Sequence, residues 1–299
     1  MTLHPQVAEK LIAAGLDPAG TERAARCALD EDFSYGPDLT SAATAPPGVT
    51  AVAVVVAREP GVLAGLAVAL AVLDAAGIPP AAAEPLCDDG DRIGRGTEVL
   101  RLTAPLRELL GAERTMLNFL THLSGVATTT RAWVDAVAGS GCAVRDTRKT
   151  TPGLRQLEKY AVRCGGGVNH RMGLGDAALV KDNHVAAGGI TAAIRAVRAA
   201  APGLPLEVEC DDLDQVRDAL TAGAELILLD NMDLVSLHAA VALARQYPAA
   251  RLEASGGLRL GMARAVAETG VDFIAVGALT HSSPALDLGL DMAADARER

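Results

Sequence analysis

The second half of the chain contains LEVEC (206–210), LILLD (226–230), RLEAS (251–255) and DFIAVG (272–277), four short apolar segments that each end in a polar residue or glycine. Two earlier segments of the same kind lie at 142–144 and 178–180. Ala-rich helical patterns separate most of these segments, and successive segments end roughly 20 to 35 residues apart, the size of one βα unit. Six such units predict a parallel sheet.

Charged residues end several of the predicted strands. This favours a β/α barrel, because the active sites of such barrels lie at the carboxyl ends of the strands. An open, doubly wound sheet is the alternative that the same alternation allows. The Gly-x-Gly-x-x-Gly motif typical of dinucleotide-binding sheets does not follow the first strand, so the barrel is the predicted fold.

The residues up to about 111 have a different pattern. A short amphipathic helix at the N-terminus precedes a β-rich run at 51–57 and an Ala/Leu/Val helix at about 63–76. The segment 87–105 has turn residues between short apolar runs, which suggests hairpin-like strands. These elements predict a small α/β domain, and apolar residues at helical spacing from about 107 to 139 predict a long helix after it.

Composition limits the classes of partner. The 299 residues include 27 Lys and Arg against 37 Asp and Glu, a formal net charge of −10, and only 2% are aromatic. DNA and RNA binding requires clustered positive charge, and binding of single strands also uses aromatic stacking. The sequence therefore predicts no nucleic-acid partner.

Three sequence features predict the cellular compartment of the protein. The N-terminus lacks a basic region followed by an apolar core, so no signal peptide is predicted. The longest apolar run, residues 61–73, is shorter than the ~20 residues that a membrane-spanning helix needs. Five widely spaced cysteines without a CxxC pair indicate reduced thiols. We expect a cytoplasmic protein with no membrane contact.

Basic residues are concentrated in RDTRKTTPGLRQLEKYAVRCGGGVNHR, residues 145–171. This segment holds seven Lys and Arg against two acidic residues, a charge of +5 over 27 residues in a protein of −10. Guanidinium groups bind carboxylate or phosphate in a bidentate way, and Gly165–Gly167 allows the backbone to approach a ligand. An anion site is predicted around three residues beside a strand end and this glycine loop: Arg148, Lys149 and Arg171. A solvated basic helix face is the alternative for three others: Arg155, Lys159 and Arg163.

Acidic side chains end two neighbouring strands. Glu209 ends LEVEC, Asp230 ends LILLD, and Glu207 shares the face of Glu209 one layer deeper. Two hard carboxylates at a basic phosphate site suggest Mg²⁺ held jointly with phosphate oxygens. A role for Asp230 as a helix N-cap, together with Asn231, is compatible with this interpretation.

Three further features bear on chemistry. Glycines follow the last two strands, at 255–257 and 277–279, where barrel loops often present backbone N–H groups to phosphate, although each loop alone is also an ordinary turn. His170 and His184 have no third ligand at metal spacing, so a zinc site is not predicted. Lys181 ends a strand, a position that also suits a Schiff-base lysine.

Taken in order, these motifs resemble the quinolinate phosphoribosyltransferase family. The looser first-domain matches are LDEDFSYGPDLTS (29–41) and REPGVLAGL (58–66), where Pro37 alters the usual spacing near Asp38. The matches that carry the resemblance are AERTMLNFLTHLSGVAT (112–128), DTRKTTPGLR (146–155), EKYAVRCGGGVNHRMGL (158–174), KDNH (181–184), EVE (207–209), LLDN (228–231), EASGG (253–257) and VGALTHS (276–282).

The resemblance implies a pentosyltransferase of NAD biosynthesis. Quinolinate and 5-phosphoribosyl 1-pyrophosphate would give nicotinate mononucleotide, pyrophosphate and CO₂, with Mg²⁺ as cofactor. The implied fold is an α/β sandwich domain, residues 1–112 joined by a tail at about 283–299, and an incomplete β/α barrel, residues 113–282. The implied assembly is a homodimer, alone or within a hexamer, in which the partner completes each site.

The resemblance also assigns residues to roles. The expected catalytic residues are Lys149, Lys181, Glu209 and Asp230, with Glu209 and Asp230 as metal ligands. Arg114 would enter from the neighbouring subunit. Quinolinate would lie among Arg148, Lys149, His170, Arg171 and Lys181. Binding of the phosphoribosyl donor would add Thr147, Ser255, Gly256, Gly257, Gly277, Ala278, Leu279 and His281.

Three alternatives remain at the level of sequence. A close relative of this family would act on another nitrogen heterocycle, although the group Arg148, Arg171 and Lys181 favours a diacid. A Schiff-base aldolase would use Lys181 as its nucleophile. A non-catalytic nucleotide-binding module would bind nicotinate mononucleotide without turnover.

Overall fold

The structure is a computed structural model that describes residues 2–185 and 188–293. The chain forms two compact units. One unit comprises residues 1–129, 151–166 and 282–299, and the other, here called the barrel unit, comprises residues 130–150 and 167–281. The boundary lies inside one long helix, and residues 294–299 of the predicted C-terminal tail lie outside the described residues. The domain boundaries inferred from sequence stay a prediction.

The barrel unit contains a six-stranded parallel sheet with the strand order β6-β11-β10-β9-β8-β7. Its strands are β6 (Ala143–Arg145), β7 (Ala178–Val180), β8 (Leu206–Cys210), β9 (Leu226–Asp230), β10 (Arg251–Ser255) and β11 (Phe273–Ala275). From β7 to β11 each strand pairs with the next in sequence, and β6 then joins β11. A doubly wound sheet would reverse its strand order partway. This order is that of a β/α barrel with no pairing between β6 and β7 among the described residues, which confirms the predicted fold class.

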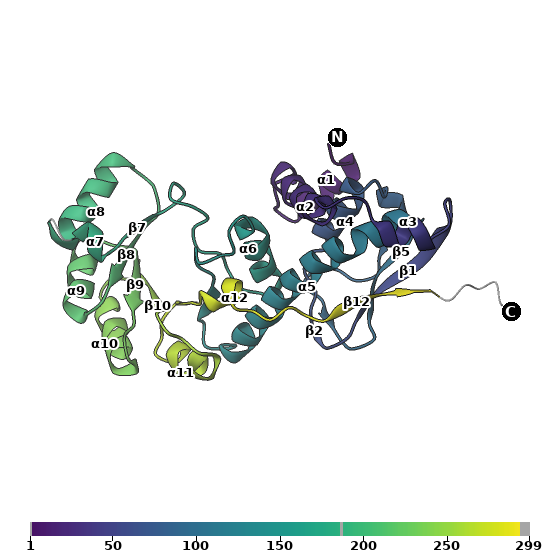
Figure 1. Ribbon diagram of the computed structural model, residues 1–299. Helices are drawn as coiled ribbons and strands as arrows, with labels where there is room; N and C mark the ends of the chain where they lie inside the picture. The colour runs from purple at the N-terminus through teal and green to yellow at the C-terminus, as the bar shows by residue number, and fades with distance from the viewer. Residues whose placement is uncertain (1, 186–187, 294–299) are drawn as a thin grey trace. The chain divides into compact units, whose positions relative to one another are not determined.

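Helices connect the barrel strands and lie outside them, as Figure 1 shows for α8 to α11. They are α7 (Asp182–Val185), α8 (Gly189–Ala200), α9 (Leu213–Thr221), α10 (Leu234–Ala244), the short 3₁₀ helix η2 (Leu260–Met262), α11 (Ala263–Ala267) and α12 (Ala278–His281). Asp212 caps α9, and Asp233 caps α10 by accepting the Ser236 N–H at 2.8 Å. The proposed capping role of Asp230 is therefore wrong, because the cap residue of α10, Asp233, lies three positions after it.

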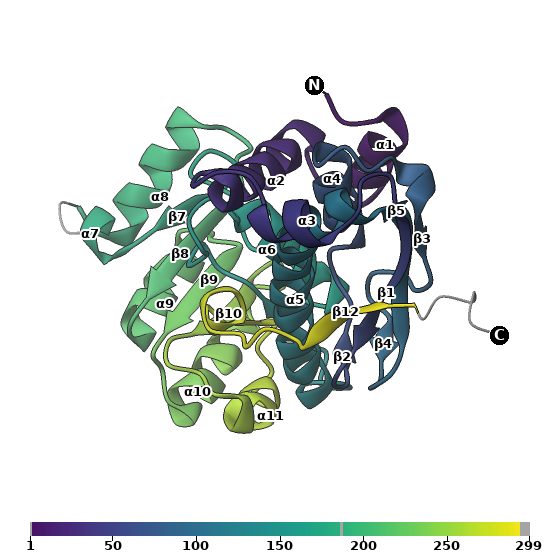
Figure 2. The ribbon, with the colours of Figure 1, turned by 45° about the vertical axis from the view of Figure 1, so that its right-hand side comes forward.

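A four-stranded antiparallel sheet with the order β12-β1-β5-β3 is the framework of the other unit. Its strands are β1 (Thr50–Ala57), β3 (Ala83–Pro85), β5 (Glu98–Pro105) and β12 (Leu288–Met292). The run predicted at 51–57 forms β1, and the last part of the chain returns to pair with it (Figure 2). The predicted hairpin at 87–105 is wrong: β4 (Arg92–Ile93) pairs with β2 (Gly61–Val62), whereas β5 pairs with β1 and β3.

Helices of this unit pack on one another around an apolar centre. They are α1 (Pro5–Ala13), α2 (Pro18–Phe33), α3 (Leu39–Thr44), α4 (Leu66–Ala75), α6 (Arg155–Cys164) and most of α5 (Leu106–Ala136), with the 3₁₀ turn η1 (Pro80–Ala82). α1 and α2 both contact α4, whose first eight residues are all buried. Burial of such a helix removes its apolar surface from water, the main favourable contribution to folding.

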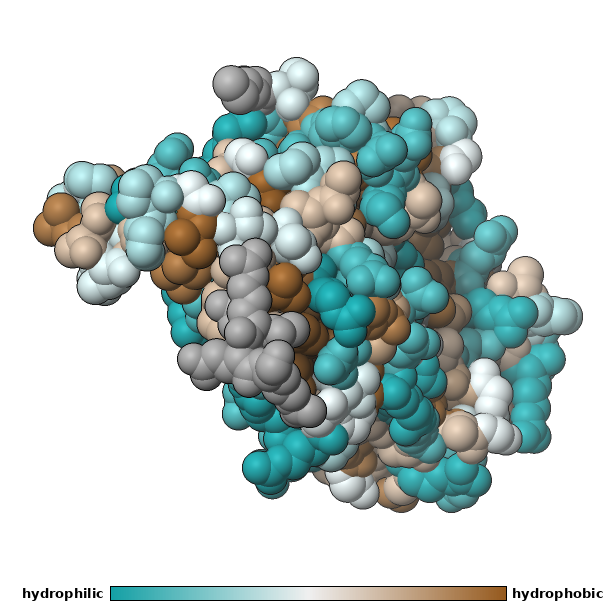
Figure 3. Space-filling view, turned by 90° about the vertical axis from the view of Figure 1, so that its right-hand side faces the viewer, coloured by the Kyte–Doolittle hydropathy of each residue, from teal (hydrophilic) through white to brown (hydrophobic). Residues whose placement is uncertain are grey.

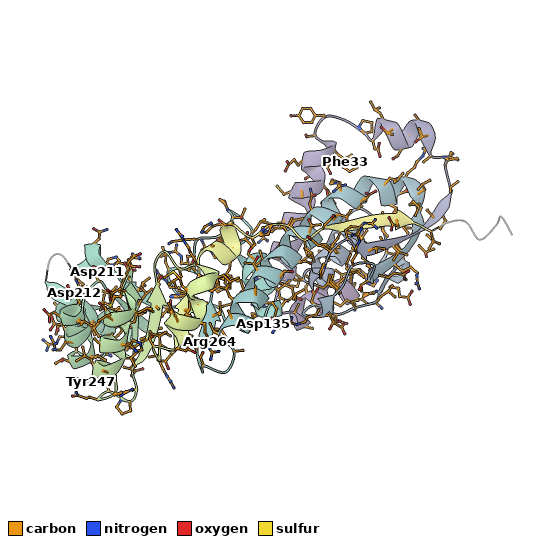
Figure 4. All side chains as sticks on the ribbon, turned by 90° about the horizontal axis from the view of Figure 1, so that it is seen from below. Phe33, Asp135, Asp211, Asp212, Tyr247 and Arg264 are labelled. Carbon is orange, nitrogen blue, oxygen red and sulfur yellow. The ribbon has the colours of Figure 1, made fainter. Side chains whose placement is uncertain are left out.

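In the barrel unit, Arg264 lies beside the end of α5, where its Nη1 donates to the carbonyl oxygen of Ala138 at 2.8 Å (Figure 4). Figure 3 shows a face on which apolar residues are scattered among hydrophilic ones. Among the described helices, none has the length and hydropathy required to cross a bilayer.

Candidate active site

A pocket of about 560 Å³ opens at the carboxyl ends of the barrel strands. The edge of a parallel sheet brings together residues that are far apart in sequence, because all its strands end there. Eleven of the residues predicted from sequence line this pocket: Thr147, Arg148, Lys149, His170, Arg171, Lys181, Glu209, Asp230, Ser255, Gly256 and Gly257. Its apolar lining consists of Leu179, Leu228 and Ala275.

Two guanidinium groups meet at one side of the pocket. Burial and the nearby positive charge of Arg148 together lower the pKa of Arg171, with burial the larger cause. The Arg171 Nη1 donates to the carbonyl oxygen of Ala177 at 3.0 Å, whereas its buried Nε has no hydrogen-bond partner among the described residues. A bound anion would relieve both the repulsion and the missing hydrogen bond.

Carboxylates also line the pocket. Glu209 Oε2 accepts from Lys181 Nζ at 2.5 Å, and the side chain of Glu209 is 14% exposed. Asp230 Oδ2 accepts from Asn231 Nδ2 at 2.6 Å. Asn231, which lines the pocket, was not predicted as a site residue, and it has the left-handed backbone (φ 53°) that Asn tolerates better than most residues. The pocket thus contains two sets of charged side chains, which meet at the pair of Lys181 and Glu209. We call them the basic side (Arg148, Lys149, Arg171 and Lys181) and the acidic side (Glu209 and Asp230).

Glycine is required at Gly256, and Gly277 leaves little room for a side chain. At Gly256 the φ is +92°, and a Cβ would lie 2.8 Å from the backbone nitrogen of Asn231. At Gly277 a Cβ would lie 3.0 Å from Lys149 Cδ and 3.4 Å from His281 Nε2. The absence of side chains therefore lets these loops approach the pocket residues closely.

Four charged or titratable side chains pack together in the interior of the barrel, and two of them, His170 and Glu253, also line the pocket. His170 Nε2 lies 2.6 Å from Glu207 Oε2 and 3.6 Å from Glu253 Oε1, and Arg145 Nη1 lies 2.5 Å from Glu253 Oε2. Both glutamates are buried. Glu253 was not predicted as a site residue, although it precedes Ser255 by two positions, the alternation that relates Glu207 to Glu209 and that would have revealed it.

Burial and the neighbouring charge of Glu207 raise the pKa of Glu253 to about 7, against the opposing effects of Arg145 and His170. The folded protein therefore binds a proton that the unfolded chain, with a pKa near 4.5, has already lost. Stability from this group is present below the unfolded pKa and is lost as the pH rises through about 7.

Replacement of Glu253 by Gln should therefore change how stability depends on pH. The melting temperature of Glu253→Gln minus that of the wild type should rise between pH 5 and pH 8, because only the wild type loses its proton in this range. Differential scanning calorimetry over this range measures it. A difference that stays constant over this range would show that Arg145 keeps Glu253 ionised throughout and would contradict the raised pKa.

Five of the predicted site residues do not line the pocket. Gly277 and His281 adjoin it, near Lys149 and Thr147, together with the intervening Ala278 and Leu279 on α12. Arg114 lies exposed on α5, in the other compact unit. The structure therefore brings together the residues that follow strands, whereas the pattern of strands says nothing about Arg114.

The interpretation of three basic residues of α6 as a solvated helix face is wrong for one of them, Lys159. Arg155, Lys159 and Arg163 lie on α6, but Lys159 is 0% exposed, as is the adjacent Glu158. Glu158 accepts the backbone N–H of Thr151 at 3.0 Å and lies 2.9 Å from His122 Nε2. A long side chain on a helix of strong amphipathic pattern was expected to reach solvent, but tertiary packing covers this one.

Comparison with known proteins places these features in a family. The family model of the quinolinate phosphoribosyl transferase C-terminal domain matches residues 126–291. The model of the N-terminal domain of the same family matches residues 38–124. A nicotinate-nucleotide pyrophosphorylase [carboxylating] from Mycobacterium leprae is 55% identical over 270 residues, which cover 89% of this chain and 95% of that protein. The human protein of the same name is 43% identical over 209 residues, 68% of this chain and 70% of that protein.

Solved structures agree with the sequence relatives. The nicotinate-nucleotide pyrophosphorylase from Francisella tularensis superposes with a TM-score of 0.85 at 36% identity, covering 92% of this chain and 96% of that chain. The NadC protein from Streptococcus pyogenes superposes with a TM-score of 0.86 at 39% identity, covering 93% and 99%. The chain belongs to the quinolinate phosphoribosyl transferase family.

Proposed function

We propose that the pocket at the carboxyl ends of the barrel strands is the active site of this phosphoribosyltransferase. The protein transfers the phosphoribosyl group of 5-phosphoribosyl 1-pyrophosphate to quinolinate and releases pyrophosphate and CO₂, which yields nicotinate mononucleotide. The observation that carries the assignment of the site is the meeting of Arg148 and Arg171 in a pocket that also contains Lys149 and Lys181. Burial, and after it the positive charge of Arg148, lowers the pKa of Arg171.

Quinolinate is a dianion with adjacent carboxylates, and the basic side of the pocket matches it. Arg148 and Arg171 offer planar forks for one carboxylate, and Lys149 and Lys181 supply point charges for the other. Leu179 and Leu228 would contact the faces of the pyridine ring. A heterocycle with a single carboxylate would leave a partly buried cation unpaired, which is costly, so the pocket favours a diacid.

The acidic side is suited to the phosphoribosyl donor. Glu209 and Asp230 would face the ribose and stabilise positive charge at C1 as pyrophosphate departs. The 5′-phosphate and pyrophosphate would lie at the glycine loops, where Gly256 and Gly277 permit close approach of the backbone. His281, which adjoins Gly277, would add a polar contact to a phosphate oxygen.

The donor set fits Mg²⁺. Glu209 and Asp230 present hard carboxylate oxygens beside a phosphate site, the combination with which proteins hold this ion. A bound Mg²⁺ would neutralise the charge of the leaving pyrophosphate. Glu209 is already paired with Lys181, so Asp230 is the carboxylate better placed to be a direct ligand, with Glu209 acting through water or substrate.

The chemistry requires no protein nucleophile. The quinolinate nitrogen attacks C1 of the ribose while the bond from C1 to pyrophosphate breaks. The resulting pyridinium ring accepts the electron pair of the carbon–carboxylate bond beside the nitrogen, CO₂ leaves, and a proton takes its place on the ring carbon. The protein contributes by holding two mutually repelling anions in contact and by placing fixed charges around the developing cation.

Lys181 does not support the Schiff-base alternative. A lysine nucleophile requires its neutral amine, and a cationic neighbour or an apolar site lowers its pKa to provide it. Here the ammonium lies 2.5 Å from the Glu209 carboxylate, which stabilises the charged form. Lys181 therefore serves better as a cation for substrate binding.

We also propose a shared site in a homodimer, alone or within a hexamer. Arg114 lies exposed on α5, and the barrel pocket described above contains no residue from its compact unit. A neighbouring subunit that supplies Arg114 would add a cation for quinolinate. The free thiols of all five cysteines support the reducing cytoplasm as the location.

An assay of carbon dioxide release tests the reaction. Quinolinate labelled with ¹⁴C in the carboxylate beside nitrogen should release ¹⁴CO₂ and pyrophosphate in equal amounts, and only with 5-phosphoribosyl 1-pyrophosphate present. A chelator should abolish both products and an excess of Mg²⁺ should restore them. Release of CO₂ and pyrophosphate that persists in the chelator would contradict the proposed role of Mg²⁺. Binding of nicotinate mononucleotide without any turnover would instead identify a non-catalytic module.

A further inference from the structure

The ring of His170 connects the anion pocket to the buried carboxylates beneath it. The backbone N–H of Arg171 donates to His170 Nδ1 at 2.7 Å. On the opposite side of the ring, Nε2 lies 2.6 Å from Glu207 Oε2 and 3.6 Å from Glu253 Oε1. His170 is only 9% exposed, so its two nitrogens are surrounded by protein.

These contacts determine which ring nitrogen carries the proton. Nδ1 accepts a hydrogen bond and therefore bears no hydrogen in this arrangement. The proton is then on Nε2, the ring nitrogen that lies close to the two carboxylates. A buried carboxylate attracts the polar N–H of an imidazole, and the hydrogen bond made by one ring nitrogen selects the tautomer at the other.

We propose that Glu207 and Glu253 are positioning residues that hold His170 in its Nε2–H tautomer, so that Nδ1 anchors the main chain of Arg171 and directs its guanidinium into the anion pocket. His170, which also lines the pocket, then acts on quinolinate through Arg171 as well as from its own position in the pocket wall. The inference rests on the proposed active site, since Arg171 must be a quinolinate ligand for the effect to be measurable.

The surrounding contacts fix this arrangement from several strands. Asp146, buried directly after β6, accepts the backbone N–H of His170 at 2.9 Å and the Asn169 Nδ2 at 2.5 Å. Arg145, at the end of β6, holds Glu253 on β10 at 2.5 Å. Asp146 thus holds the main chain of His170 and the side chain of Asn169, and the His170 ring lies against carboxylates of β8 and β10. The carboxylates therefore orient His170 from two strands of the barrel.

A metal ion is the other ligand that this cluster could suggest, since one ligand atom from each of His170, Glu207 and Glu253 lies within 4.8 Å of the others. Coordination by Nε2 would require the ring proton on Nδ1, where the Arg171 N–H already donates. Arg145 also supplies positive charge to Glu253. The geometry therefore favours a ring proton over a metal at Nε2.

The first test is a measurement on the unmodified enzyme. The protein has six histidines, so ¹⁵N labelling of histidine gives few imidazole signals, and His170→Asn identifies the one of interest. Two-bond ¹H–¹⁵N correlation spectra distinguish the two tautomers. We expect the Nε2–H pattern for His170. The Nδ1–H pattern in the wild type would overturn the proposal, whether or not any variant folds.

Glu207→Gln tests the consequence for substrate binding. It keeps the shape of the side chain and removes the charge that selects the tautomer. We expect the KM for quinolinate to rise by about tenfold, the order of effect that follows when a buried interaction with a charged group is lost, and the KM for 5-phosphoribosyl 1-pyrophosphate to change less than twofold. The His170 signal should show a mixture of tautomers.

Glu268→Gln is the matched control. Glu268 forms an exposed pair with Arg264 at 2.7 Å in the same compact unit, and its replacement should leave both KM values unchanged. Equal changes of both KM values in Glu207→Gln, with an unchanged tautomer, would show a general structural role and contradict the proposal. Absence of turnover in the wild type would instead contradict the proposed function, so the two failures are distinguishable.

Discussion

Replacing Arg171 by alanine should weaken quinolinate binding by about 10- to 150-fold, because a hydrogen-bonded pair between charged groups contributes about 1.5–3 kcal/mol. The guanidinium of Arg171 is partly buried, is repelled by Arg148, and has an Nε with no hydrogen-bond partner in the described part of the chain. A bound anion would therefore accept a hydrogen bond from this Nε and offset the repulsion between the two guanidinium groups. Isothermal titration calorimetry with quinolinate measures the change in dissociation constant.

Two further variants test whether the loss of quinolinate affinity is specific to the guanidinium group of Arg171. Arg171→Lys keeps the charge but loses the planar fork, so its affinity should lie between those of the wild type and Arg171→Ala. Arg217→Ala removes an exposed arginine that pairs with Asp214 on α9, and it should bind quinolinate like the wild type. Unchanged affinity in Arg171→Ala would move quinolinate away from the basic side of the pocket.

Arg114→Ala and Lys181→Ala should each be inactive, yet heterodimers of the two should recover about half of the wild-type activity per dimer. Lys181 lies in the barrel unit and Arg114 in the other compact unit. If each site uses the barrel of one subunit and Arg114 of its partner, one of the two sites in a heterodimer has both residues intact. Co-expression with two different affinity tags isolates the heterodimer for a pyrophosphate-release assay.

The matched control is a heterodimer in which both substitutions lie in the barrel unit. Lys181 and Glu209 form an ion pair within one barrel unit, so a heterodimer of Lys181→Ala and Glu209→Ala has a defective barrel in both subunits. It should stay inactive. Absence of recovery in the Arg114 and Lys181 heterodimer as well would show that the sites are not shared between subunits.

The strands of the barrel were predictable because each one carries a strong local signal. LEVEC, LILLD and RLEAS become β8, β9 and β10 with the predicted bounds, since a short apolar run between helical patterns has few other ways to bury its side chains. The hairpin expected at 87–105 failed for the opposite reason. Turn residues mark where a chain bends, but the partner of a two-residue strand such as β4 is selected by tertiary contacts, here with β2.

The pocket was partly predictable for the same reason. Arg148, Lys181, Glu209 and Asp230 follow or end strands, and parallel strands end at one edge, so their convergence follows from the fold class alone. Lys159 was not predictable, because a basic residue on an amphipathic helix ordinarily reaches water, and only the structure shows it fully buried. Arg114 entered through the resemblance and not through any pattern of its own.

By itself, the sequence determined the parallel strands, the concentration of positive charge at 145–171 and the family, since each is carried by local residue order. Alternation along β8 also predicted that Glu207 lies one layer deeper than Glu209. Only the tertiary structure decided which side chains these two acids meet: Glu207 lies against His170 in the barrel interior, and Glu209 pairs with Lys181. The physical reason is that alternation orders the side chains of one strand, whereas their partners come from other strands and loops that only the folded chain brings together.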